Sequence, residues 1–143
     1  MHKPIRLLIA DNDIRFLHSF KTFLDRQKDI KVINMVRDGH GAVKACKDMM
    51  PDITLLDLHL PVVDSVRAVQ SIIAQNEFSK ILVTSSTPND RYALEAIKVG
   101  ACGFVEKKDG NNYQEIAHAI NQIAIGDVVL NSTLASHILR EFS

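Results

Sequence analysis

Four polar segments of this 143-residue chain contain residue types that together could handle a phosphoryl group and a divalent cation. Each follows a short apolar run, and in chain order they are Asp11-Asn12-Asp13, Asp57, Thr84-Ser85 and Lys107. Mg²⁺ prefers a few oxygen ligands and keeps waters, so a carboxylate pair and a backbone carbonyl would suffice to hold it. A lysine can neutralise phosphoryl oxygens opposite the metal, while a hydroxyl contacts another of them. Asp57 is then either a metal ligand or a nucleophile that forms an acyl phosphate.

Five short apolar runs predict the buried strands that precede these segments. The runs cover residues 5–10, 31–36, 53–56, 81–84 and 104–105. Apolar residues at helical spacing follow each run, and the segment from Asn112 to Glu115 resembles the capping box of a helix. Alternating strands and helices predict an α/β fold with a parallel sheet covered on both faces. Because ligands bind beyond the carboxyl ends of such strands, the polar segments should meet at one sheet edge.

Composition excludes several classes of protein. With 46% hydrophobic and 24% charged residues, the chain is neither disordered nor collagen-like, and its length suits one domain. Basic and acidic residues number 17 each, so the chain lacks the basic surplus of a domain that grips nucleic acid. Two cysteines cannot form a disulfide framework, and the sequence has neither a signal-peptide pattern nor an apolar run of about 18 residues. We therefore expect a cytoplasmic protein without membrane contact.

The tail, residues 127–143, contains a sixth, short helix with an apolar stripe. The stripe consists of Leu134, Ala135, Ile138, Leu139 and Phe142. Isolated helices of this length are marginal in water, so the stripe needs a surface to pack against. That surface belongs to this domain, to a second copy of the chain or to a further domain.

Three motifs at matching separations resemble those of the response-regulator receiver domains of two-component signalling, most closely the NarL/LuxR branch. They are Asp52 to Pro61, Leu82 to Ser85, and Gly100 to Lys107. The similarity runs from about Ile5 to Gly126, and the next segment resembles the post-receiver segment of that branch. The resemblance implies a flavodoxin-like, doubly wound five-stranded parallel sheet. It also implies a receiver domain over residues 1–126 and a linker with a short helix over 127–143.

The resemblance further implies a role for each matching residue. Asp57 would be the phosphoacceptor, Lys107 the phosphoryl-binding lysine and Thr84 the switch hydroxyl. Ser85 would leave room for the phosphoryl group, and Phe104 would be the switch aromatic.

A Mg²⁺ ion is the implied cofactor, and its ligands would be Asp11, Asn12, Asp57 and the backbone carbonyl of His59. We expect the histidine to matter only through this backbone group. The family usually has an aspartate in place of Asn12, and the lost charge should weaken Mg²⁺ binding. Asp13 is a possible further ligand, but it is better interpreted as the N-cap of the first helix, where a carboxylate accepts helix N–H bonds. A second departure is Ser65 after Asp64, where the family usually has glycine, which could alter the turn.

The implied function is a signalling switch. A sensor histidine kinase would phosphorylate Asp57, and the chain would control an output, usually transcription, while catalysing only its own phosphorylation and dephosphorylation. We expect a homodimer that contacts DNA only through a C-terminal helix-turn-helix domain beyond this chain. Asn12 motivates an alternative, a pseudo-receiver that acts by protein contact without phosphorylation. A remote alternative is a phosphatase of the haloacid-dehalogenase type, since Asp11-Asn12-Asp13 meets its Asp-x-Asp motif, although Arg15 stands where that class has Thr or Val.

Overall fold

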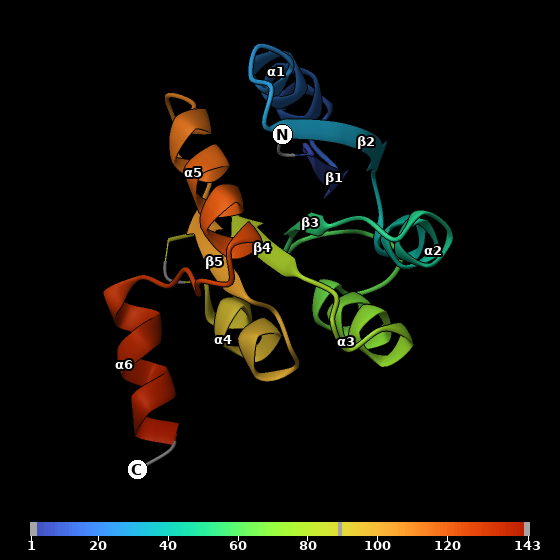
Figure 1. Ribbon diagram of the computed structural model, residues 1–143. Coiled ribbons are helices and arrows are strands. Elements are labelled where there is room, and N and C mark those ends of the chain that lie inside the picture. The colour runs from blue at the N-terminus through green and yellow to red at the C-terminus, as the bar shows by residue number, and fades with distance from the viewer. Residues whose placement is uncertain (1–2, 89, 142–143) are drawn as a thin grey trace.

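Five parallel strands form one sheet in the computed structural model, which describes residues 3–88 and 90–141. The strands are β1 (Ile5–Ala10), β2 (Ile30–Val36), β3 (Ile53–Asp57), β4 (Ile81–Ser85) and β5 (Gly103–Glu106). Their order across the sheet is β2-β1-β3-β4-β5 (Figure 1). The predicted α/β fold with a doubly wound parallel sheet is confirmed. The strand order reverses between β1 and β3, so a crevice for ligands is expected at their carboxyl ends.

The described part of the chain also forms six helices, and five of them cover the two faces of the sheet (Figure 1). They are α1 (Ile14–Asp25), α2 (Gly39–Met49), α3 (Ser65–Gln75), α4 (Arg91–Lys98), α5 (Tyr113–Ala124) and α6 (Ser132–Glu141). Side chains alternate along β1, so that Leu7 and Ile9 pack with α1 and α5, whereas Leu8 and Ala10 pack with α2, α3 and α4. None of the described helices is both long enough and apolar enough to cross a membrane.

Aspartate side chains begin four of the helices at the carboxyl edge of the sheet. Asp13, Asp38, Asp64 and Asp90 each accept a backbone N–H from the first turn of the helix that follows. The capping box predicted at Asn112 is wrong in its hydrogen bonds. The helix does begin after Asn112, but the side-chain amide of this residue donates to the Glu106 carbonyl and to Glu115. These bonds join the end of β5 to the start of α5.

The tail packs on its own domain. Val129 forms a bridge with Gly103 and accepts the N–H of Phe104 at 2.8 Å, which covers the open edge of β5. Helix α6 then lies against α4, where Leu134 is buried in the core. The predicted stripe is therefore only partly used, since Leu139 is 71% exposed, and Phe142 lies outside the described residues.

Val62, in the loop before α3, has a left-handed backbone with φ of 74° and is 80% exposed. A β-branched residue pays about 1–2 kcal/mol in this region, whereas glycine does not. We predict that Val62→Gly raises the free energy of unfolding by about 0.5–1 kcal/mol, measured by urea denaturation.

Ile125 provides the matched control, because it is equally exposed but has φ of −90°. Ile125→Gly should lower stability by a similar amount. Equal losses in both variants would contradict the strain at Val62.

Candidate functional site

Three charged side chains from different strands meet at the carboxyl edge of the sheet. Asp11 follows β1, Asp57 ends β3 and Lys107 follows β5. The Lys107 ammonium donates to Asp11 Oδ2 at 2.6 Å and to Asp57 Oδ2 at 2.7 Å. All three side chains are largely shielded from water, with 10% of Lys107, 13% of Asp57 and 2% of Asp11 exposed. The structure thus brings together the acids and the lysine that the sequence predicted would converge.

The electrostatics of this cluster follow from its burial. Burial, followed by repulsion from Asp57, raises the pKa of Asp11 even though Lys107 opposes the shift. Burial would lower the pKa of Lys107, but the two carboxylates outweigh it and raise the pKa. The ammonium also lies 4.7 Å from the ring centroid of Phe16, a cation–π contact that the sequence analysis missed. Lys107 is therefore a protonated counter-ion for both acids.

The oxygen ligands of the predicted Mg²⁺ site fit that metal in part. Asp11 Oδ1 accepts the Asp13 N–H at 2.9 Å, and Asp57 Oδ1 accepts the His59 N–H at 2.8 Å. Two carboxylates and a backbone carbonyl are a sufficient set for Mg²⁺ with waters. Asn12 is exposed at the same edge and would add a neutral ligand. Asp13 Oδ1 instead accepts two N–H groups of α1, which agrees with the N-cap interpretation.

The hydroxyl of Thr84 is the one buried side-chain polar atom without a hydrogen-bond partner among the described residues. Thr84 pairs directly with Asp57 in the register of β3 and β4. Leaving such a group unsatisfied costs about 1–3 kcal/mol, so its place beside the carboxylate requires an explanation. The neighbouring Ser85 differs, because its hydroxyl donates to Asp90 at 2.7 Å.

Two side chains form contacts around Asp57 that the sequence did not predict. The Ser65 hydroxyl donates to the Asp57 carbonyl at 2.7 Å and accepts the Leu60 N–H at 3.1 Å, so this departure from glycine fixes the loop. Asp90 accepts a hydrogen bond from the His59 ring at 2.6 Å. The expectation that His59 acts only through its backbone is therefore wrong, since the ring reaches the N-cap of α4. Only the N-cap position of Asp90, before a helical pattern, gave a signal in the sequence.

Phe104 lies on β5 beside Val83 and is 4% exposed. It lines a cavity of about 240 Å³ between α4 and α6, together with Leu134 and His137. The predicted switch aromatic thus points inward in this structure, beneath the tail helix.

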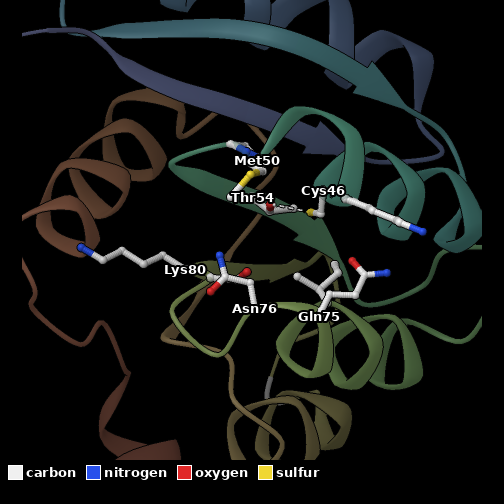
Figure 2. A pocket seen from close by; sticks show the side chains of 10 residues that line it. Cys46, Met50, Thr54, Gln75, Asn76 and Lys80 are labelled. Atoms are coloured by element: carbon white, nitrogen blue, oxygen red, sulfur yellow. Dashed lines mark hydrogen bonds between the residues drawn. The ribbon is translucent and has the colours of Figure 1, made fainter.

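A second cavity, of about 150 Å³, lies at the opposite edge of the sheet (Figure 2). The Cys46 thiol faces it and contacts the Thr54 hydroxyl at 3.3 Å. Burial raises the pKa of this thiol, which keeps it in its unreactive protonated form. The groups suited to phosphoryl chemistry lie at the carboxyl edge instead.

Comparison with known proteins adds an independent finding. A family model described as the response regulator receiver domain matches residues 7–121. The transcriptional regulatory protein LiaR of Bacillus subtilis is 30% identical over 135 residues, which make up 94% of this chain and 63% of that protein. A protein-glutamate methylesterase/protein-glutamine glutaminase of Caldanaerobacter subterraneus subsp. tengcongensis is 33% identical over 125 residues, 87% of this chain and 33% of that protein. The chain thus spans one third to less than two thirds of these relatives.

The fold is also similar to solved structures. A two-component response regulator of the LuxR family from Aurantimonas sp. SI85-9A1 matches with a TM-score of 0.84 and 24% identity, covering 96% of this chain and 97% of that one. At this identity the likeness concerns the fold alone.

Asn12 offers a direct test of the cation site. Asn12→Asp would place a third carboxylate at the edge that holds Asp11 and Asp57, and we predict that it tightens Mg²⁺ binding by about tenfold or more, as measured by isothermal titration calorimetry. The control is Asn76→Asp, which makes the same charge change at the opposite edge and keeps its oxygen on the Phe78 N–H. Equal affinities in both variants would mean that Asn12 does not face the metal.

Proposed function

Because the chain belongs to the response regulator receiver domain family, we propose that Asp57 accepts a phosphoryl group from a sensor histidine kinase and that the chain then changes conformation to control an output. Asp57 would be the phosphoacceptor, Lys107 the phosphoryl-binding residue and Thr84 the switch hydroxyl.

The observation that carries this proposal is the unpartnered hydroxyl of Thr84 beside Asp57. In the resting chain this buried donor makes no hydrogen bond with any described residue. A phosphoryl group on Asp57 would bring acceptor oxygens to the adjacent strand position. Forming that bond would recover the desolvation cost of the hydroxyl, so phosphorylation would favour a conformation in which Thr84 moves toward Asp57.

The transfer needs little covalent chemistry from the protein. A carboxylate oxygen of Asp57 attacks the phosphorus of a phosphohistidine, an O–P bond forms, and the N–P bond breaks as the imidazole leaves. The Lys107 ammonium already contacts Asp57, and it would neutralise charge on the phosphoryl oxygens. Mg²⁺ held by Asp11, Asp57, the His59 carbonyl and Asn12 would supply further charge neutralisation.

The output is proposed by analogy with the relatives. LiaR is a transcriptional regulatory protein and is longer than this chain. We propose a receiver over residues 1–126 with a linker and helix over 127–143, acting as a cytoplasmic homodimer that contacts DNA through a further C-terminal domain. The chain itself would act only on its own Asp57, with no external substrate to turn over. Ser85 would border the phosphoryl group, and Phe104 would respond to movement of Thr84.

Asn12 supports a second candidate, a pseudo-receiver that works by protein contact. Lys107 already contacts both carboxylates, so one of their two negative charges is neutralised before any metal enters. With one acid fewer than the family usually has, the resting arrangement could serve as a permanent contact surface.

We predict that intact-protein mass spectrometry will detect one phosphoryl adduct after incubation with acetyl phosphate and Mg²⁺, and none on Asp57→Asn. The control is Asp64→Asn in the same loop, because asparagine caps α3 equally well, and this variant should be labelled like the wild type. Labelling of Asp57→Asn would remove Asp57 from its role. An adduct that appears only after Asn12→Asp would support the pseudo-receiver.

Thr84→Val should impair the conformational change without destabilising the unphosphorylated chain. Since the hydroxyl is unpartnered, its removal should leave stability unchanged or raise it by about 1 kcal/mol, measured by urea denaturation. The same variant should be labelled at Asp57 but lose the change in amide NMR shifts that labelling produces in the wild type. Thr84→Ser keeps the hydroxyl and should retain that change. A marked loss of stability in Thr84→Val would mean that the hydroxyl is already bonded.

A further inference from the structure

His59 contacts both the phosphoacceptor and the start of α4. Its backbone N–H donates to Asp57 Oδ1 at 2.8 Å, and its ring Nε2 lies 2.6 Å from Asp90 Oδ2. The Asp90 side chain is only 3% exposed, whereas half of the His59 side chain is in water. Because an ionised carboxylate can only accept, the proton of this bond belongs to Nε2. One residue therefore joins the loop after β3 to the loop after β4.

Asp90 in turn bonds to Ser85, the residue after Thr84. Asp90 Oδ2, which accepts from the His59 ring, also accepts the Ser85 hydroxyl at 2.7 Å. Asp90 Oδ1 accepts the Tyr92 N–H at 2.9 Å. Ser85 in turn accepts the Thr87 N–H at 3.0 Å. Burial would raise the pKa of Asp90, but its hydrogen bonds with Ser85, Tyr92 and His59 outweigh it and lower the pKa. The acceptor at the centre of this network is thus a carboxylate anion.

The surroundings fix the orientation of the imidazole. The Tyr92 ring meets it edge-on, with centroids 5.9 Å apart, and the Arg91 guanidinium lies 5.3 Å from the Tyr92 centroid. The backbone of His59 cannot follow a moving α4, because its N–H is held by Asp57 and the carbonyl of Asp57 is held by Ser65. Movement of Asp90 away from its present place would therefore break the bond to the ring.

We propose that His59 is a positioning residue whose ring holds Asp90, and through it Ser85 and Thr87, in the arrangement of the unphosphorylated chain. The inference rests on the proposed function, since movement of Thr84 toward a phosphoryl group would pull Ser85 with it. This movement has to work against the bond between His59 and Asp90. The side chain two residues after the phosphoacceptor thus sets how readily the chain switches.

Titration with beryllofluoride and Mg²⁺, followed by amide NMR, tests this proposal. His59→Leu should bind beryllofluoride about fivefold more tightly than the wild type, because the resting arrangement has lost one hydrogen bond to a charged group. His59→Gln should restore wild-type affinity, since its amide can donate to Asp90 in place of Nε2. His18→Leu, an exposed histidine on α1, is the control and should change nothing. Unchanged or weaker binding in His59→Leu would overturn the proposal, because a merely structural loss does not tighten binding.

Hydrogen exchange without phosphoryl mimic separates this inference from the proposed function. The amides of Thr87 and Tyr92 should exchange several-fold faster in His59→Leu than in the wild type, and His59→Gln should restore their protection. Asparagine at position 90 can still cap α4. The double variant with Asp90→Asn and His59→Leu should therefore exchange these amides little faster than His59→Leu alone, because both changes remove the same bond. Unchanged exchange would overturn the positioning role of the bond between His59 and Asp90 even where beryllofluoride binds. Faster exchange with no beryllofluoride binding, also in the Asn12→Asp background, would overturn the proposed function and the switching role that rests on it.

Discussion

The site depends on the contacts of the Lys107 ammonium with both Asp11 and Asp57. Two shielded carboxylates repel one another, and the lysine is the cation that contacts both. Removing one partner of such a buried cluster costs about 3–5 kcal/mol, because a charge is left without compensation. The order of the strands follows the same requirement, since β1 and β3 are neighbours and the lysine reaches them from β5 across β4. The sheet thus presents two carboxylates and one ammonium, with one net negative charge, at its carboxyl edge.

Thr84 lies next to that cluster on the adjacent strand. The charged groups of the cluster contact one another, whereas the Thr84 hydroxyl is buried without a partner among the described residues. Sites that violate the rule of satisfied polar groups are commonly functional, because the cost persists only where the surrounding structure enforces it. Lys107 thus bonds both carboxylates, while the neighbouring Thr84 hydroxyl remains available to donate to a further acceptor. Adjacent strands supply these two opposite conditions at Asp57 and Thr84.

Sequence patterns predicted the parts of this structure that depend on local chemistry. Continuous apolar runs identified all five strands, and the polarity change at their ends located Asp11, Asp57 and Lys107 at one edge. The ring of His59 was not predicted, because its partner Asp90 lies 31 residues away and is brought near only by the packing of α4. Ser65 was equally hidden, since a serine at a helix start gives no sign that it bonds backward to Asp57.

The packing partner of the tail helix could not be predicted for the same reason. An amphipathic stripe indicates that a helix packs against another surface, but it does not identify that surface. The structure resolves this through Val129, which forms one parallel bridge beside β5 at the open edge of the sheet, and α6 then packs against α4. Leu134 then packs over the cavity that Phe104 lines. Phe104 therefore belongs to the same hydrophobic cluster as Leu134 and faces the tail helix across the cavity. A rearrangement that turned this ring would change the lining of that cavity, which α6 shares through Leu134 and His137.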